Sequence, residues 1–354
     1  MDFADWSISI RNPIIDITIF ISIPSMALYV AEIVTIVRHK NFHNSFYALF
    51  VMRAIPDWLG VLNSFYCQRL PAIFGSQMYP IYSKFPNWMC AMALFLSGTT
   101  FQANNLVTTL LLLNRFTAIT LPTKHEKLWR KLLPLLTFLV YFVPIFLCSP
   151  VFKMNATIQL NDPNSTTDRS FIMYEAGDAP YVNYILNVSA TFSVIFTVVC
   201  VLSNVCTFVA YKLHVKNVGT NGNNNNGHDI EKKLLIYALA TFLGHSLVAS
   251  LLIPTITNIA APETMTILYI YYPLLMDTGT VVLSSWLLLW ASSKFRQQLF
   301  KDFAIIRKTN IQNNRVGPME GHRNNNLQAV GGAVGHQYIS SYISSVQQLP
   351  TVSS

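Results

Sequence analysis

Four ionisable side chains stand out within long apolar stretches of the sequence: Glu32, Arg53, Asp57 and Asp277. A charged group in a hydrocarbon layer is costly, so such residues pair with one another, bind ions or protons, or fix helix packing. Arg53 and Asp57 are four residues apart and therefore share one face of a helix. Asn104 falls at a similar depth in another apolar stretch. These five residues predict a polar cluster inside the protein.

In this cluster Arg53 would be neutralised by Glu32 or Asp57, which leaves more acids than bases. Either one carboxyl group is protonated or a cation occupies the site. Three roles stay open at this point. The cluster is a packing device that fixes helix pairing, a conformational switch, or part of an ion path that includes Arg53, Asp57 and Asp277.

A second candidate site lies in the stretch VTTLLLLNRFTAITLP, residues 107–122. An apolar run with the pattern of a helix reaches Asn114, Arg115 and Phe116, and a basic loop follows Pro122. We expect Arg115 to lie at the edge of a membrane and to face a partner there. Since Asn114 carries no charge, it cannot form an ion pair with Arg115, and the restraint on Arg115 should be weak.

The composition places these residues in a membrane protein. Fifty-two per cent of residues are hydrophobic and 11% are charged, against about 25% charged residues in soluble domains. The mean hydropathy is +0.38. The net charge is +8, and the basic residues lie between the hydrophobic segments. The sequence has no nucleic-acid-binding motif, and both observations argue against a nucleic-acid partner. No metal, cofactor or enzymatic arrangement is recognisable, and His245 is a lone histidine in an apolar segment.

Seven segments are apolar enough to cross a bilayer, which takes about 20 residues. We predict an all-α membrane protein, a bundle of seven transmembrane helices. The predicted spans are residues 14–37, 46–66, 87–114, 132–152, 182–210, 234–257 and 265–290.

The distribution of Lys and Arg predicts the orientation of these spans. One side of the membrane holds 18 of the 24 basic residues and the other holds 5, while Arg53 lies within a span. The N-terminus is therefore expected outside and the C-terminus inside. This gives four predicted regions: an extracellular N-terminus (1–13), a seven-span domain (14–290), an amphipathic inner-leaflet helix (291–303) and a disordered cytoplasmic tail (304–354).

The predicted outer loop 153–180 carries two glycosylation sequons, at Asn155 and Asn164. Two sequons on the side selected by charge support the predicted orientation. Cys67 and Cys90 also fall on this side, where a disulfide between them can form. The alternative is two free thiols.

The amphipathic helix is predicted from SSKFRQQLFKDF, residues 292–303. Phe295, Leu299 and Phe303, with Phe300, recur at helical spacing opposite basic and polar residues. This pattern is typical of a helix on a membrane surface, and an ordinary solvated helix is the alternative.

Prolines in several spans are expected to kink the helices and open a central cavity near the outer side. Residues at the right depth to line such a cavity are Phe95, Thr99, Gln102, Tyr184, Thr255 and Tyr272. Aromatic residues at such depths more often contact lipid or the protein core than a ligand.

The motif at residues 114–116 and the seven spans resemble the G protein-coupled receptors. Asn114, Arg115 and Phe116 match the place of the rhodopsin-like Asp-Arg-Tyr, and Pro122 matches the proline that follows. The chain departs from that pattern elsewhere. It has no Asn-Pro-x-x-Tyr in span seven and no Cys-Trp-x-Pro in span six, and loop 153–180 has no cysteine for the usual disulfide.

A closer resemblance, over roughly residues 14–303, is to the nematode serpentine chemoreceptors, the superfamily that includes classes gamma and V. The residues that carry it are LLLNRFTAITLPTKHEKLW (111–129), PSMALYV (24–30), HNSFYALF (43–50) and LLLWASSKFRQQLF (287–300). The resemblance implies a receptor in the plasma membrane, in sensory cilia if chemosensory. It would bind a small molecule or peptide and contact a heterotrimeric G protein through Asn114, Arg115 and Phe116. A transporter or channel is the alternative function.

Overall fold

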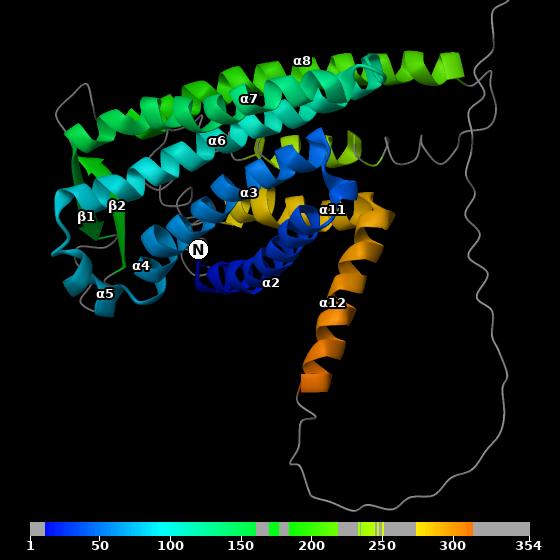
Figure 1. The fold of residues 1–354 in the computed structure, drawn as a ribbon. Coiled ribbons are helices and arrows are strands. Elements are labelled where there is room, and N and C mark those ends of the chain that lie inside the picture. The colour runs from blue at the N-terminus through cyan, green and yellow to red at the C-terminus, as the bar shows by residue number, and fades with distance from the viewer. Residues whose placement is uncertain are drawn as a thin grey trace, which may run out of the picture. The chain divides into compact units, whose positions relative to one another are not determined.

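The computed structural model describes residues 11–160, 170–176, 184–218, 233, 235–244, 246–247, 250 and 274–313, and over these residues the chain is mostly helical (Figure 1). Residues 1–306 form one compact unit and residues 307–354 a second. The features below belong to the first unit, apart from the last turns of the final helix.

Five helical stretches are long and apolar enough to cross a membrane: Pro13–Arg38, Ser45–Ile73, His125–Lys153, Tyr184–Leu213 and Leu274–Ala291. They correspond to predicted spans one, two, four, five and seven. Of predicted span six, the structure describes chiefly the short apolar helix Leu235–Gly244. The count of seven spans and their orientation therefore stay predictions.

The main helices are α2 (Arg11–Arg38), α3 (Ser45–Ser64), α6 (Asn87–Thr120), α7 (His125–Cys148), α8 (Tyr184–Val218), α11 (Leu283–Ala291) and α12 (Ser293–Asn313). Shorter elements connect them: η1 (Lys40–Phe42), η2 (Phe65–Arg69), α4 (Leu70–Ile73), α5 (Gly75–Tyr82), η3 (Ser149–Lys153) and η4 (Thr278–Val282). Both η2 and η4 are single π-helical turns. Each extends the span beside it.

Helix α6 occupies the centre of the bundle, where it packs against α3, α7 and α8. It corresponds to predicted span three but runs to Thr120, six residues beyond the predicted end. Polar side chains along it, among them Gln102, Asn104 and Thr108, are buried by the neighbouring helices. Its polarity explains why it is not among the five most apolar stretches.

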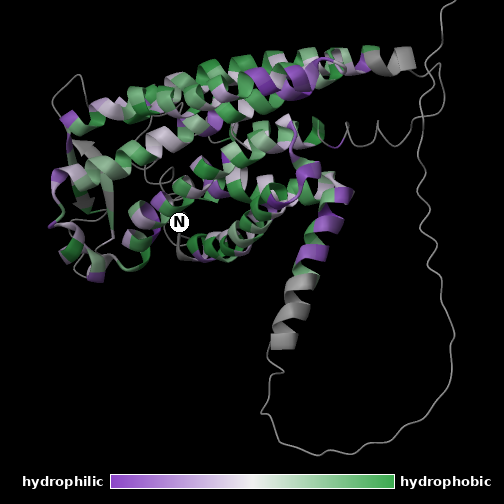
Figure 2. Cartoon of the chain, viewed as in Figure 1, coloured by the Kyte–Doolittle hydropathy of each residue, from purple (hydrophilic) through white to green (hydrophobic). Residues whose placement is uncertain are grey.

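Helix α7 presents an apolar outer surface to its surroundings (Figure 2). Only 17% of the most apolar part of the stretch His125–Lys153 is buried within the protein, against 61% for the stretch that contains α3. Phe138, Phe142 and Phe146 are each at least half exposed. Exposed aromatic side chains along a helix of this length are accounted for by contact with lipid.

The expectation of an all-α fold was wrong in one place, because residues of the predicted loop 153–180 form a β-hairpin. Strands β1 (Asn155–Leu160) and β2 (Phe171–Ala176) pair antiparallel, with Asn155 opposite Ala176 and Leu160 opposite Phe171. The side chain of Asn87, the first residue of α6, donates to Met154 O (2.9 Å) and accepts from Ala156 N (2.6 Å). The hairpin is thereby attached to the start of α6.

The helix predicted at 291–303 begins at Ser293 and extends to Asn313 as α12. The four residues of its expected apolar face do not share one environment. Phe295 and Leu299 are buried, and the Phe295 ring packs on Phe42 with centroids 5.1 Å apart. Phe300 and Phe303 are exposed. Half of the predicted face therefore contacts the bundle rather than a membrane surface.

Candidate functional site

Arg115 lies on α6, five residues before the helix ends at Thr120. Its guanidinium donates to Oδ1 of Asn114 at 3.3 Å and lies over the ring of Phe46 on α3, with the guanidinium carbon 4.1 Å from the centroid. Asn114 is fully buried and Phe116 is half-buried. Arg115 is thus held by an amide oxygen and an aromatic face rather than by a carboxylate at position 114.

Ser45, the first residue of α3, connects this arginine to α7. Its hydroxyl accepts a hydrogen bond from Asn114 Nδ2 at 2.9 Å and donates to Glu126 Oε1 at 2.8 Å. The backbone N–H of Ser45 also donates to Glu126. Since a helix N-terminus favours a nearby carboxylate, Glu126 is well placed at the start of α3. One serine therefore ties α3, α6 and α7 together.

A second set of contacts joins α6 to α7. The indole of Trp129 donates to Thr117 Oγ1 at 2.8 Å, and the same hydroxyl lies 3.1 Å from His125 Nδ1. The other ring nitrogen of His125 lies 3.1 Å from Ser45 Oγ. Around this network the basic side chains of α7 and its N-cap are exposed, namely Lys124, Lys127, Arg130 and Lys131. This end of the bundle can present positive charge to an acidic partner.

The predicted polar cluster separates into two buried ion pairs. In the first, Arg53 Nε lies 3.3 Å from Asp57 Oδ2, and both side chains are fully buried. Tyr29 donates to the same Asp57 oxygen at 3.0 Å, and Arg53 donates to Gly279 O at 3.4 Å. Asn104 lies beside the Asp57 carboxylate. This pair links α2, α3 and α6 with the seventh predicted span.

The second pair joins Asp277 to Arg69, one of the five basic residues that the charge count places in the outer loops. Arg69 is not an exposed loop residue, because its side chain is buried and pairs with Asp277. Arg69 also lies over the Phe65 ring at 4.2 Å, and Ser22 donates to Asp277 at 2.7 Å. The apolar run LPAIF after Arg69 is the sequence signal that the helical stretch continues beyond it.

The remaining acid of the cluster, Glu32, stands apart from both pairs. It is fully buried, and neither of its carboxylate oxygens makes a hydrogen bond within the described residues. Within the described residues, the two buried arginines Arg53 and Arg69 pair with Asp57 and Asp277. Glu32 is the third acid of the predicted cluster and is in neither pair.

The predicted cavity residues lie mainly in helix contacts. The Phe95 ring packs on Phe152 with centroids 5.0 Å apart, Gln102 donates to Cys148 Sγ at 3.4 Å, and Tyr184 donates to Leu147 O at 3.0 Å. Thr99 is half-buried, and its hydroxyl makes no hydrogen bond within the described residues. Thr255 and Tyr272 lie outside the described residues. Three of the six candidates therefore lie in contacts between α6, η3, α7 and α8.

Three of the remaining candidate residues are described. Cys67 and Cys90 are both free thiols in the structure, and Cys67 Sγ donates to Asn63 Oδ1 at 3.4 Å. Asn155 is exposed at the start of β1, so its amide is accessible to modification. Asn164 lies outside the described residues.

Near the start of α3, α12 is held by a polar contact that the sequence did not predict. His39 Nε2 lies 2.9 Å from Asp302 Oδ2, and Gln298 donates to the other Asp302 oxygen at 3.1 Å. Burial raises the pKa of Asp302, but the hydrogen bonds from His39 and Gln298 outweigh it and bring the pKa below its ordinary value. The ionised carboxylate is the form that holds α12 beside η1.

Comparison with known proteins agrees with the resemblance carried by the sequence motifs. The sequence model of the Srg family chemoreceptors matches residues 16–299, which is most of the chain. The matched range includes the helices from α2 to α11, apart from the first residues of α2. No curated protein matches the chain. The match and the apolar helices together identify a membrane protein, and the chain belongs to the Srg family, a family of nematode serpentine chemoreceptors.

Proposed function

We propose that this protein is a chemosensory receptor that binds a small molecule or peptide from the outer side and activates a heterotrimeric G protein at the Arg115 end of the bundle. Membership of a chemoreceptor family supports the receptor class. The observation that carries the G protein assignment is the position of Arg115, between the Phe46 ring and the Asn114 amide, at the end of the bundle where the start of α7 carries exposed basic side chains.

The contacts of Arg115 suggest how a conformational change would expose it. Asn114, Ser45 and Glu126 form a continuous hydrogen-bonded chain from α6 through α3 to α7. A ligand can shift the receptor between two states only if it binds one state more tightly. In the proposed active state, the helix that contains Tyr237 moves away from α6 and Phe46 shifts with it, since the Phe46 and Tyr237 rings are in contact (centroids 5.6 Å apart). Arg115 then becomes available to the C-terminus of a Gα subunit.

The test is a chemical screen in cells that express the receptor with a G protein coupled to calcium release. Any active compound is then applied to Arg115→Ala and to Lys84→Ala, an exposed basic residue just before the start of α6 that serves as the control. We expect Arg115→Ala to abolish the response and Lys84→Ala to retain it at equal surface expression. A full response in Arg115→Ala would contradict the G protein assignment.

The same variants distinguish the transporter or channel alternative. In the structure, Asp57 and Asp277 are each paired with an arginine, so this reading requires the pairs to open during transport. Currents or uptake that survive Arg115→Ala and are lost in Asp57→Asn would favour a transporter.

A further inference from the structure

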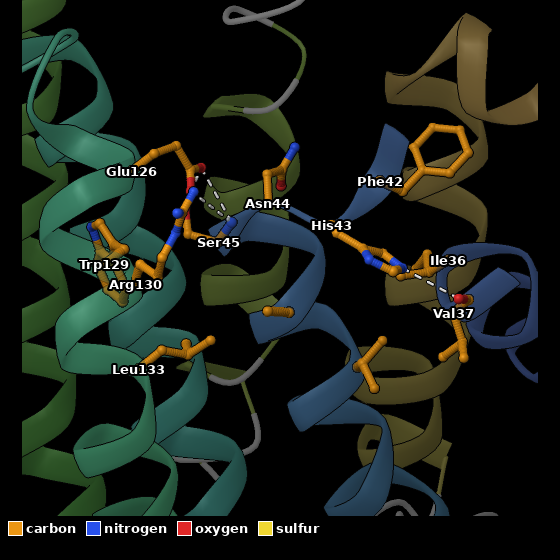
Figure 3. Close-up of a pocket in the computed structure, with 12 residues that line it drawn as sticks. Ile36, Val37, Phe42, His43, Asn44, Ser45, Glu126, Trp129, Arg130 and Leu133 are labelled. Carbon is orange, nitrogen blue, oxygen red and sulfur yellow. Dashed lines mark hydrogen bonds between the residues drawn. The ribbon is translucent and has the colours of Figure 1, made fainter. Parts of the chain in front are cut away.

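A cavity of about 500 Å³ lies at the Arg115 end of the bundle, between the end of α2, η1, the start of α3 and the start of α7 (Figure 3). Its volume falls within the range of small-molecule sites, about 300–1,000 Å³. Most of its wall is apolar, contributed by Ile36, Val37, Phe42, Ala48, Val51 and Leu133. The function proposed above uses Ser45 and Glu126 from its lining but places no ligand in the cavity.

Two basic side chains border the apolar wall, His43 and Arg130. Both are exposed, and Arg130 makes no hydrogen bond or ion pair within the described residues. The one acid of the lining, Glu126, accepts hydrogen bonds from the backbone N–H and the hydroxyl of Ser45. Its charge is therefore offset by the start of α3, and the cation of Arg130 remains for a ligand.

The surroundings of the cavity are apolar on the outer surfaces of both flanking helices. Val34 and Val37 on α2 and Leu128 and Leu132 on α7 are exposed. Exposed aliphatic side chains on membrane-spanning helices contact lipid, so a lipid acyl chain can reach the cavity from the bilayer. A free anion would leave the apolar wall uncovered, and an apolar ligand would leave Arg130 without a partner.

We propose that this cavity binds an anionic phospholipid of the leaflet on the Arg115 side. The phosphate group contacts Arg130, and the first part of an acyl chain covers Ile36, Val51 and Leu133. His43 borders the headgroup, but its Nε2 already lies 3.2 Å from Val37 O. Basic pockets between membrane helices on the cytoplasmic side recognise anionic headgroups in this way. The charge distribution predicts that this is the cytoplasmic side, where anionic lipids are concentrated.

The test uses the purified full chain in detergent and native mass spectrometry, which counts bound lipids and subunits. Dioctanoyl phosphatidylserine, dioctanoyl phosphatidylcholine and inorganic phosphate are titrated separately. We expect one phosphatidylserine to bind with clear preference over phosphatidylcholine, and inorganic phosphate to bind far more weakly. Equal binding of the two lipids would overturn the proposal. So would equal binding of inorganic phosphate, which would indicate a site for a free anion.

Three variants locate the binding site. Arg130→Gln should weaken phosphatidylserine binding about fivefold, whereas Lys127→Gln, on the same helix but outside the cavity, should leave it unchanged. Ala48→Phe fills the cavity without changing charge and should abolish binding; Ala48→Leu is the milder version if the first does not fold. Equal affinities in Arg130→Gln and Lys127→Gln would overturn the assignment. A dimer that Ala48→Phe removes would assign the cavity to a second copy of the chain instead.

Discussion

The guanidinium carbon of Arg115 lies 4.1 Å from the centroid of the Phe46 ring, so a cation of α6 is held by an aromatic side chain of α3. A cation–π contact contributes about 0.5–2 kcal/mol, depending on how far the pair is removed from water. Arg115 is partly buried, so its contact with Phe46 is a substantial restraint. In our proposal this contact takes the part that an acidic neighbour takes in rhodopsin-like receptors.

Replacing Phe46 with Leu removes the ring and retains an apolar side chain. We expect basal G protein signalling to rise about two- to tenfold at equal surface expression, because roughly 0.5–1.4 kcal/mol of restraint on Arg115 is lost. Phe46→Tyr keeps an aromatic face and serves as the control, with basal signalling near that of the wild type. Unchanged signalling in Phe46→Leu would show that the contact does not restrain Arg115.

Replacing Asn114 with Asp places a carboxylate where the amide oxygen of Asn114 accepts from Arg115 at 3.3 Å. Because hydrogen bonds between charged partners are about twice as strong as neutral ones, Arg115 should be held more firmly. We expect lower basal signalling, measured at matched surface levels, and higher basal signalling in Asn114→Ala. Equal basal signalling in wild type and Asn114→Asp would rule out a restraint at this position.

The buried pair of Arg69 and Asp277 predicts a large effect on folding. Arg69→Leu leaves the Asp277 carboxylate without its partner, and breaking a buried ion pair costs about 3–5 kcal/mol. We expect the variant to be retained inside the cell, as measured by surface staining, and Arg53→Leu to behave in the same way.

Two comparisons test this explanation. Lys84→Leu alters an exposed basic residue on the same side of the bundle and should reach the surface normally. The double variant Arg69→Leu with Asp277→Asn removes both charges and should recover part of the surface expression. Normal expression of Arg69→Leu alone would contradict a stabilising role for the pair.

The contact between His39 and Asp302 predicts a dependence of stability on pH. Asp302 has a lowered pKa in the folded protein, so its contribution is present above the ordinary carboxyl pKa and is lost as the pH falls through the folded value. At pH 7 we expect Asp302→Asn to lower the melting temperature by about 2 °C. This difference should begin to shrink below about pH 4, near the ordinary pKa of an aspartate, and should disappear once the pH is below the lowered pKa of the folded protein. A difference that does not shrink as the pH falls through this range would assign the effect to packing rather than charge.

The exposed Asn155 at the start of β1 allows a test of orientation. If the hairpin lies outside, Asn155 carries a glycan, and treatment with a glycosidase increases the mobility of the protein on a gel. Asn155→Gln should remove one step of this shift, and replacement of Thr157, the third sequon residue, by Ala should do the same. No change with either variant, together with staining of an N-terminal tag only in permeabilised cells, would reverse the predicted orientation.

The sequence predicts a membrane protein and most of its helices, because the length of an apolar segment can be read from neighbouring residues alone. Predicted spans one, two, four, five and seven each match an apolar helical stretch, and the described ends of spans two and four differ from the predicted ones by up to seven residues. The hairpin was not predicted, since its strands are short and one end is fixed by the side chain of Asn87, more than 60 residues earlier. The division of the α12 apolar face could not be seen either, because Phe295 is buried by Phe42 and Tyr47 from a distant part of the chain.

The contacts of the candidate residues followed from the sequence only where they are local. Helical spacing placed Arg53 on the same face as Asp57, and in the structure Arg53 Nε lies 3.3 Å from Asp57 Oδ2. The partner of Asp277 was not predicted, because Arg69 looked like a loop residue until η2 and α4 continued the helical stretch. Arg115 was identified from its place at the end of an apolar run. Its contact with Phe46 depends on how α3 packs on α6, which no local pattern reveals.

The seventh predicted span also contains Gly279, whose backbone approaches the sixth at Gly244. A Cβ atom added to Gly244 would lie 2.9 Å from Gly279 Cα and 3.2 Å from Gly279 O. The same Gly279 carbonyl accepts from Arg53, so the backbone here is fixed on both sides. If activation moves the helix Leu235–Gly244 away from α6, we expect the helix to pivot at Gly244. Its displacement would then be largest at the other end, near Leu235.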